Sequence, residues 1–562
     1  MTTYCLDAGP LATAFEQAAA WLADTRFADA LWQRRLDVWE VDAAARRAIA
    51  NRLGWLGALD FVTPHVDRIR RTAASVCDAG FTDVLLLGMG GSSLAAEVLR
   101  HVLGVAPGYP RFRMLDSIDP DAVRAAMDRA PSTLFMLASK SGGTIEPNAM
   151  AAEARRLVEA AGHVPYGSRF IAITDEHTVL HRRAIDDRFR EVFLNSSDIG
   201  GRYSALSFFG LVPAALMGAD LEPLLAAARG MEQACRRADV TANPGLALGA
   251  FMAAGAGCGR DKLTLLVADR LASLGLWIEQ LVAESTGKRG KGIVPITGEP
   301  DDAPFGPDRM AVAVSVGSER PSETVLARAR AAGTPLLEIE MPGATAIGAE
   351  FLRWEVATAA AGALLRINPF DEPNVQEAKD ATRALLDSYG ATGRLPIPHA
   401  QATVEGAALA LTGRAEQAIV SRSPLAFLAL IAPGDYFALL AYLPPGDPRF
   451  ATVLQEFRAE VSRRAGCATM AGYGPRYLHS TGQLHKGGAD NGVLLIVTAE
   501  PAPDLPIPGH PFSFGTLELA QAVGDFQSLD RIGRRALHLH LPRRDPELLR
   551  HVLNHLARSG LP

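Results

Sequence analysis

The stretch that most constrains this chain is an apolar run, residues 134–138, that stops at the polar and glycine-rich segment Ser139-Lys-Ser-Gly-Gly-Thr144. The run has the length and continuity of a strand buried in a parallel sheet. A helical pattern follows, with Thr144 placed to cap it and Glu146 in its first turn. Glycines let backbone N–H groups turn inward, and a helix N-terminus adds partial positive charge. The stretch therefore predicts a pocket for a phosphate-sized anion; the alternative is an ordinary strand-to-helix turn with polar caps.

The composition is that of a soluble globular protein with several domains. A chain of 562 residues exceeds the size of one hydrophobic core, so we expect about three domains. The formal net charge of −6 argues against a general nucleic-acid binder, which carries a basic domain. Five scattered cysteines without a CxxC pair indicate a reducing compartment. No signal-peptide pattern and no apolar run of ~18 residues is found, so we expect a cytoplasmic protein without membrane partners.

Strands that alternate with helices predict an α/β fold with parallel sheets. Short apolar runs separated by helical patterns begin near residue 83 and again near residue 263, which indicates two similar α/β units with a cleft between them. A helical leader precedes them, and a proline-rich stretch introduces an additional C-terminal α/β module. The predicted leader, first unit, second unit and C-terminal module are residues 1–60, 61–220, 221–395 and 396–562.

A second glycine-rich loop, Gly88-Met-Gly-Gly-Ser-Ser93, follows the first predicted strand of the first unit. It is a poor dinucleotide fingerprint, because Ser93 stands where glycine or alanine is needed. It suits a turn that brings backbone close to a sugar or a phosphate. Neither this loop nor residues 139–144 has the GxxxxGK[ST] order of a nucleotide P-loop, so the sequence argues against nucleotide binding.

Three charged residues stand out as candidates for chemistry. Arg202 follows a glycine turn and can stabilise an oxyanion, although it can equally be a surface arginine. Glu284 ends a strongly apolar helical pattern, where partial desolvation raises the pKa of a carboxylate towards that of a useful base. Helix-terminal polarity is the simpler explanation of Glu284 alone. Lys379 lies four residues after Val375, on one helical face, and is expected to point into the protein.

Taken together and in this order, the motifs GMGGSS, SKSGGT, GGRYS, AESTGK and NPFDEPNVQEAK resemble phosphoglucose isomerase. The nearest resemblance is to the isomerase portion of the fused transaldolase–phosphoglucose isomerases, and it covers roughly residues 60–390. It implies two flavodoxin-like sugar-isomerase (SIS) domains with the site between them. It also implies reversible isomerisation of glucose 6-phosphate and fructose 6-phosphate through an enediolate.

The resemblance also implies roles for single residues. The substrate phosphate is expected to bind to the loop of residues 139–144, at Ser139, Lys140, Ser141 and Thr144. The sugar is expected to contact Gly91 and Ser92 of the other glycine-rich loop. Glu284 is expected to move a proton between C2 and C1, with Arg202 stabilising the enediolate. Lys379 matches the lysine that assists at the ring oxygen. This chemistry needs no metal and no redox cofactor.

One feature departs from the family pattern. The family uses a histidine between the base glutamate and the C-terminal lysine to open the sugar ring, and this chain has no histidine between Glu284 and Lys379. His399 and His479 are candidates, but our hypothesis is that the polar segment around residue 480 reaches the cleft. His485 is then expected to open the ring, with Lys486 adding positive charge. The alternative is a polar loop of the C-terminal module.

Several alternatives stay open at this point. The same site can act on mannose 6-phosphate as well, or the protein can be a non-catalytic sugar-phosphate sensor. Retention of the base, the arginine and the lysine argues against a sensor, and the missing histidine argues for it. The expected partner is a small-molecule sugar phosphate. A homodimer is the pattern of the family, and a monomer is the alternative if the C-terminal module supplies the missing group within one chain.

Overall fold

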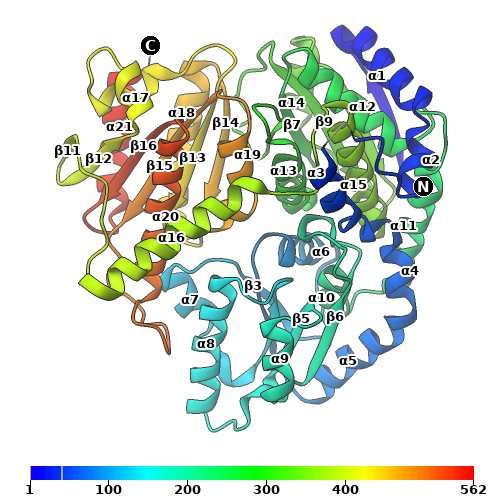
Figure 1. Ribbon diagram of the computed structural model, residues 1–562, viewed down its shortest axis with the longest axis horizontal. Helices are drawn as coiled ribbons and strands as arrows, with labels where there is room; N and C mark the ends of the chain where they lie inside the picture. Colours follow the sequence, from blue (N-terminus) through cyan, green and yellow to red (C-terminus); the bar gives the residue numbers. More distant parts are fainter. Residues whose placement is uncertain (1, 40–41, 562) are drawn as a thin grey trace.

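The computed structural model describes residues 2–39 and 42–561 and contains three mainly parallel β-sheets with flanking helices (Figure 1). In Figure 1 the first unit lies at the bottom, the second unit at the upper right and the C-terminal module at the upper left. The predicted α/β class is confirmed. Within the described residues, every helix is too short or too polar to cross a lipid bilayer.

The first sheet has the strand order β3-β2-β4-β5-β6, and all neighbouring strands are parallel. Counted from its own first strand, this is the 2-1-3-4-5 order of flavodoxin-like sheets. In such sheets a crevice opens where the order reverses, here between the loops that follow β2 and β4. The strands are β2 (Asp83–Leu87), β3 (Arg111–Leu115), β4 (Thr133–Ala138), β5 (Phe170–Asp175) and β6 (Glu191–Asn195), and the helices are α5 (Val66–Asp78), α6 (Leu94–Leu103), α7 (Pro120–Ala126), α8 (Ile145–Ala160), α9 (Val179–Asp186) and α10 (Phe208–Leu216).

The second sheet repeats this order in β8-β7-β9-β10, and an N-terminal strand, β1, takes the fifth place. The strands β7, β8, β9 and β10 pair in parallel, whereas β1 runs antiparallel to β10, with Thr3 opposite Glu340. The two units therefore share one layout. The strands are β1 (Thr3–Asp7), β7 (Lys262–Val267), β8 (Val294–Ile296), β9 (Arg309–Val316) and β10 (Leu336–Met341), and the helices are α11 (Leu221–Cys235), α12 (Pro244–Gly257), α13 (Ala272–Thr286), α14 (Glu323–Ala331) and α15 (Ile347–Leu364).

The strand β1 corrects the expectation of a purely helical leader. Its residues alternate between exposed and partly buried, which is the pattern of a strand at a sheet edge. A run of five residues is too short for periodicity to separate strand from helix, and its partner lies far along the chain. The rest of the leader is helical as predicted, in α1 (Ala12–Asp24), α2 (Phe27–Trp32), α3 (Ala43–Ala50) and α4 (Ala58–Val62).

The C-terminal module is a six-stranded sheet of order β11-β12-β16-β15-β13-β14, parallel from β16 to β14. The long helix α16 (Pro373–Thr392) connects the second unit to this module and packs against α20 (Figure 1). The strands are β11 (Ala402–Val404), β12 (Ala407–Leu411), β13 (Tyr436–Tyr442), β14 (Ala468–Tyr473), β15 (Gly492–Ala499) and β16 (Arg535–Leu541), and the helices are α17 (Gly413–Ala418), α18 (Pro448–Ala465), α19 (Gly482–Gly487), α20 (Phe514–Arg531) and α21 (Pro546–Gly560).

Hydrophobic clusters tie the C-terminal module to both units. One cluster joins strands of the first unit to Leu385 of α16 and to Leu517 of α20. Another joins Ala283 of α13 to Tyr436 and Leu484 of the module. The module is thus packed against the cleft between the units, and its loops can contribute to that cleft. The segment boundaries at residues 60, 220 and 395 stay predictions.

Candidate functional site

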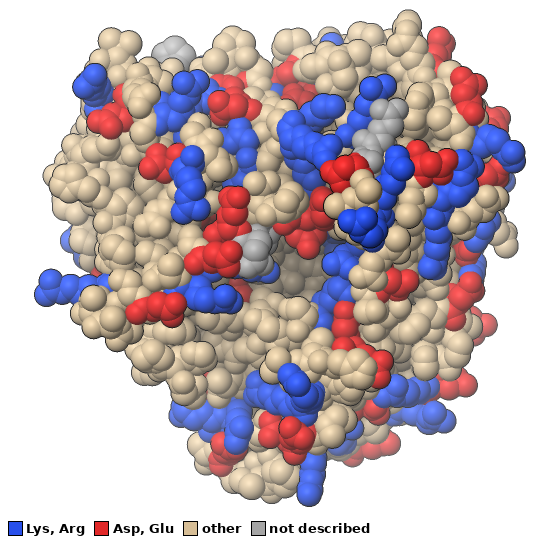
Figure 2. Space-filling model, viewed as in Figure 1, with Lys and Arg blue, Asp and Glu red and all other residues tan. Residues whose placement is uncertain are grey.

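The candidate site is a cleft of about 470 Å³ at the carboxyl edge of the first sheet. The loops after β2 and β4 form one wall, at the place where the strand order reverses. The second unit contributes Gln280 and Glu284 to the other wall, and the C-terminal module contributes His479. Figure 2 shows a hollow near the centre of this face with acidic and basic side chains close together around it. The site predicted between the two units therefore includes a third contributor.

Glycines in the loop after β2 allow three parts of the chain to meet. A Cβ atom at Gly90, whose φ is +53°, would lie 2.7 Å from the carbonyl oxygen of His479. A Cβ atom at Gly91 would overlap the carbonyl of Gly201, next to Arg202. The loop thus approaches the backbone of His479 and of Gly201 closely, and its predicted approach to a sugar or a phosphate stays a prediction. Gly91 and Ser92 both line the cleft, as expected for residues that contact the sugar.

The loop after β4 presents hydroxyl groups at the start of α8. Thr144 is the N-cap residue of α8, yet its side chain makes no capping hydrogen bond and its Oγ1 lies 3.4 Å from Oγ of Ser139. Gly142 has a φ of +67°, a backbone conformation that glycine adopts without strain. The first-turn N–H groups of α8 and these hydroxyls form a site with anion-binding character. Ser141 and Thr144 line the cleft, and Ser139 lies buried just behind.

Lys140 lies in the same loop and lines the cleft, but its amino group is already engaged. Nζ forms an ion pair with Asp175 and donates a hydrogen bond to the carbonyl of Ser197 at 2.8 Å. The residue thus contributes positive charge near the loop while it fixes the ends of β4 and β5 against the segment after β6. A place for Lys140 beside the substrate phosphate stays a prediction.

Glu284 stands in the last turn of α13 with its side chain only 12% exposed. Its Oε1 lies 3.2 Å from Nη1 of Arg202, and its Oε2 accepts a hydrogen bond from Nε2 of Gln280 at 3.1 Å. Burial raises the pKa of Glu284, Arg202 opposes this, and the negative charge of Glu372 adds to it. The net pKa is above the usual range of a glutamate, as a general base near neutral pH requires.

Arg202 is held rigidly beside this carboxylate. Its Nε donates to Oγ of Ser285 at 2.8 Å, and its Nη2 donates to the carbonyls of Pro369 and Asp371 at 3.0 and 2.9 Å. The side chain is 4% exposed. Burial lowers the pKa of Arg202, but Glu284 and Glu372 outweigh it, so the guanidinium stays charged. A fixed cation next to a raised-pKa carboxylate suits proton abstraction that leaves an oxyanion.

The sequence reasoning gave no role to Lys288, a buried lysine of the AESTGK motif. Its Nζ donates to the carbonyl of Asn368 at 2.6 Å and pairs with Oδ1 of Asp371 at 2.8 Å. Burial and the nearby Arg202 lower its pKa to about 8. Lys288 thereby holds the turn before α16 against the end of α13. The sequence could have indicated this contact, because Lys288 belongs to the AESTGK motif and Asp371 to the NPFDEPNVQEAK motif.

Lys379 lies on α16 and lines the cleft, but it is exposed. The expectation that it points into the protein rather than into solvent is wrong, because Lys379 faces a cleft that is open to solvent. Val375, on which that expectation was based, belongs to the side chains that the structure does not describe. The other residues of the α16 turn that reach the cleft include Glu372, which sequence reasoning missed.

The hypothesis for His485 is corrected by its position. Its side chain is buried inside the C-terminal module, 3% exposed, with Nδ1 3.0 Å from the hydroxyl of Tyr436. Burial, Lys486 and Arg534 lower its pKa to about 3, so the ring stays neutral at ordinary pH. Lys486 is likewise buried, in an ion pair with Asp525. His485 packs against β13 because α19 turns this face towards the sheet rather than the cleft.

His479 is the histidine that the same polar segment brings to the cleft. Its Nε2 lies 2.8 Å from Oε1 of Glu146, and its backbone carbonyl accepts a hydrogen bond from Gln280 at 2.7 Å. Glu146 is 2% exposed and also accepts from Nε2 of Gln521 at 2.7 Å. Burial raises the pKa of Glu146, but His479 and the hydrogen bonds outweigh it and lower the pKa to about 2. A charged carboxylate therefore orients the imidazole.

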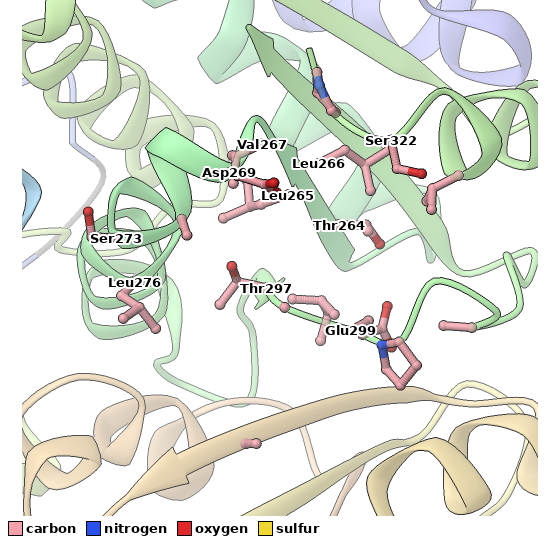
Figure 3. Close-up of a pocket in the computed structure, with 18 of the residues that line it drawn as sticks. Thr264, Leu265, Leu266, Val267, Asp269, Ser273, Leu276, Thr297, Glu299 and Ser322 are labelled. Atoms are coloured by element: carbon pink, nitrogen blue, oxygen red, sulfur yellow. The ribbon is translucent and has the colours of Figure 1, made fainter. Parts of the chain in front are cut away.

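The second sheet has its own crevice at the corresponding place, a cavity of about 480 Å³ (Figure 3). It runs along β7, whose residues 264–267 line it, and next to the end of β8 and the loop that starts at Thr297. Within the described residues, Oγ1 of Thr264 accepts from Arg309 at 3.0 Å and Glu299 binds the same guanidinium, whereas the buried hydroxyl of Ser273 has no hydrogen-bond partner. Each of the two units thus has one crevice, and Glu284 and Arg202 line the crevice of the first unit.

Comparison with known proteins adds an independent finding. The family model described as phosphoglucose isomerase matches residues 66–296. A glucose-6-phosphate isomerase of Parasynechococcus marenigrum (strain WH8102) is 34% identical over 350 residues, which are 55% of this chain and 63% of that relative. One of Synechococcus sp. (strain CC9605) is 30% identical over 367 residues, which are 58% and 69%. The chain thus spans just under two thirds of the length of the first of these relatives.

Solved structures agree on the fold. A hypothetical protein from Thermus thermophilus matches with a TM-score of 0.56 and 22% identity, over 68% of this chain and 99% of that chain. A glucose-6-phosphate isomerase from Chlamydia trachomatis matches with a TM-score of 0.56 and 17% identity, over 68% and 87%. The motifs, the cleft geometry and the sequence relatives lead to one assignment. The chain belongs to the phosphoglucose isomerase family.

Proposed function

We propose that this protein is a glucose-6-phosphate isomerase, which interconverts glucose 6-phosphate and fructose 6-phosphate in glycolysis and gluconeogenesis. The observation that carries the proposal is the pair of Glu284 and Arg202, 3.2 Å apart in a cleft that also contains a loop with anion-binding character. Aldose–ketose isomerisation needs a base, a fixed cation and an anchor for the phosphate. The named relatives support the same activity.

The phosphate binds at the start of α8. Ser141 and Thr144 donate their hydroxyls to it, and the N–H groups of the first turn complete the anchor. Ser139 supports Thr144, and Lys140 adds positive charge from its pair with Asp175. Binding energy from this remote group orients the reacting carbons over the base. Gly91 and Ser92 contact the sugar between the phosphate and Glu284.

The proton transfer is performed by one carboxylate. Glu284 removes the proton from C2 of the open-chain aldose, and the electron pair forms the C1–C2 double bond of an enediolate. Arg202 stabilises the negative charge on the oxygen as it develops. The C1 carbonyl oxygen takes up the negative charge, and the hydroxyl proton of O2 passes to O1. The protonated Glu284 then returns its proton to C1, and the C2 carbonyl forms, which yields the ketose. Its raised pKa suits both steps, because the group must accept a proton and release it again.

Ring opening requires a group that moves a proton between the ring oxygen and the neighbouring hydroxyl. We assign this role to His479 in place of His485, with Glu146 fixing the imidazole at 2.8 Å. Lys379 reaches the same cleft from α16 and assists at the ring oxygen.

All these groups come from one chain, so a monomer can be active. The cysteines are free thiols, which supports a cytoplasmic location.

The test is turnover of fructose 6-phosphate, coupled to a glucose-6-phosphate dehydrogenase readout, for the wild type and Glu284→Gln. We expect wild-type turnover and a loss of about 10³-fold in the variant, the size that removal of a general base produces. A folded wild type that binds fructose 6-phosphate without turnover would overturn the proposal in favour of a sensor. Mannose 6-phosphate in the same assay decides whether the activity extends to the C2 epimer.

A further inference from the structure

Arg202 is shared between two carboxylates. Its Nη1 lies 3.2 Å from Oε1 of Glu284 and 3.0 Å from Oε2 of Glu372. The other nitrogens of the guanidinium are bound to Ser285, Pro369 and Asp371, as described above. Nη1 is therefore the part of the cation for which the two carboxylates compete.

We propose that Glu372 is a positioning residue, which shares Nη1 of Arg202 with Glu284 and so prevents the base and its cation from closing into a one-to-one ion pair. This inference rests on the proposed function only in that Glu284 is the base. A carboxylate locked in such a pair is a weak base, and an arginine locked in it is less available to an oxyanion. Glu372 relieves both constraints by accepting a hydrogen bond from Nη1 of Arg202.

The chain geometry leaves Glu372 free for this role. It is the residue before Pro373, at the N-cap position of α16, but its side chain makes no capping hydrogen bond. The N–H group of Asn374 instead donates to Oε1 of Gln483 at 2.9 Å. The Glu372 side chain is 41% exposed and lines the cleft together with Arg202 and Glu284.

The neighbouring acidic residue has a different partner. Oδ1 of Asp371 pairs with Nζ of Lys288 at 2.8 Å, whereas Glu372 pairs with Arg202. Two adjacent carboxylates of one turn thus serve two separate cations. Of these two carboxylates, Glu372 is the one that contacts the same guanidinium nitrogen as Glu284, so we assign the effect to this position of the turn.

The charges around Glu284 agree with this division. Arg202 and Lys288 are the cations that favour its ionised form, and Glu372 is the acidic group that opposes it. Burial raises the pKa of Glu372, but Arg202, Lys288 and Arg52 outweigh it, so Glu372 stays ionised. Removal of the Glu372 charge then leaves Arg202 to Glu284 alone, which lowers the pKa of Glu284.

The first experiment follows the Glu284 carboxyl directly, without turnover. In protein labelled with 13C at the glutamate side-chain carboxyl, the Glu284 signal is assigned by its loss in Glu284→Gln and titrated by NMR. We expect this signal to titrate at lower pH in Glu372→Gln than in the wild type, and to move back towards the wild type in Glu372→Asp. Unchanged titration in Glu372→Gln overturns the inference, whether or not the protein is an isomerase.

Turnover supplies the second readout. If the wild type converts fructose 6-phosphate, Glu372→Gln should shift the acid limb of kcat/KM to lower pH and lower plateau kcat about three- to tenfold, with a smaller change in KM. The control is Glu377→Gln, which removes the same charge from the exposed face of α16 and should behave as the wild type. An acid limb that moves equally in both variants reflects net charge alone and also overturns the inference. Absent wild-type turnover contradicts the proposed function and leaves the titration result standing.

Discussion

Nε2 of His479 lies 2.8 Å from a carboxylate oxygen of Glu146, although the two residues are 333 positions apart in the chain. The contact joins the C-terminal module to α8, the helix that follows the loop of residues 139–144. Through His479 the C-terminal module contributes to the cleft, whereas the sequence suggested His485 for this contribution. The contact also distinguishes the two histidines of one polar segment, since His479 lines the cleft and His485 is buried inside the module.

The first prediction concerns ring opening. His479→Ala should slow turnover of cyclic fructose 6-phosphate about 10²-fold or more, because a general acid–base group is lost. It should spare solvent exchange of the C2 proton in an aldotetrose 4-phosphate, which cannot close a ring because its O4 is esterified. Glu284→Gln should abolish both reactions. NMR detection of the exchange in deuterated water measures this difference.

His485→Ala is the matched comparison for that prediction. It should retain turnover but melt at a lower temperature, since it removes a buried ring that packs against Tyr436. If His485→Ala loses turnover and His479→Ala keeps it, the assignment of the ring-opening group is reversed.

The second prediction concerns the phosphate anchor. Ser141→Ala and Thr144→Ala should each raise KM for fructose 6-phosphate about tenfold or more with little change in kcat, since a hydrogen bond to a charged group contributes about 1.5–3 kcal/mol. Inorganic phosphate should compete less well in both variants. Ser168→Ala, at an exposed hydroxyl of the same unit, is the control. Unchanged KM in both loop variants would place the phosphate elsewhere.

The third prediction concerns the close approach of backbones at Gly91. A methyl group there overlaps the carbonyl of Gly201 and displaces the turn that carries Arg202. Gly91→Ala should therefore lower kcat strongly and destabilise the fold by about 1–3 kcal/mol. Gly230→Ala, where a Cβ meets no atom within 4 Å on helix α11, should be neutral or slightly stabilising. Equal behaviour of the two variants in thermal melting and turnover would contradict this account.

The fourth prediction is a pH dependence of stability. The pKa of Glu146 is lowered to about 2 in the folded protein, against 4.5 ordinarily. Its charged form thus stabilises the fold above about pH 4.5, and this contribution is lost as the pH falls towards 2. Glu146→Gln should melt below the wild type at pH 7, and the gap should narrow steadily below pH 4.5. A gap that is the same at pH 7 and pH 3 would show that the charge is not the cause.

The fifth prediction follows from a site made by one chain. Turnover per chain should not depend on protein concentration, because the base, its arginine, the phosphate loop and His479 all belong to one molecule. Activity measured over a dilution series, beside light scattering of the same samples, tests this. Specific activity that falls together with dissociation of a dimer would mean that a second chain completes the site.

Much of the site could be predicted because it follows local rules. Ser139 and Gly91 come directly after buried strands, and the carboxyl ends of parallel strands gather at one edge of a sheet. Glu284 and Arg202 belong to motifs with an ordered spacing. Repeated strand–helix alternation predicts the parallel sheets, whereas the flavodoxin-like layout of each unit was implied by the family resemblance. These features depend on residues that are close together in the chain.

The errors share a different physical origin. The choice between His479 and His485 depends on how the C-terminal module packs against the two units, and no local pattern contains that orientation. The strand β1 has only five residues, too few for a periodic signal, and its partner β10 lies more than 300 positions further along the chain. The sharing of Arg202 by Glu372 likewise joins segments far apart in sequence. Long-range packing, rather than residue type, decides each of these cases.

The antiparallel strand β1 has a consequence for synthesis of the protein on the ribosome. The chain emerges N-terminus first, so residues 3–7 leave the exit tunnel long before their partner β10 has been translated. Until then β1 has unpaired backbone groups, and the second sheet keeps an open edge that invites pairing with other chains. A bulky N-terminal fusion that hinders this late docking should therefore lower the soluble yield more than the same fusion at the C-terminus.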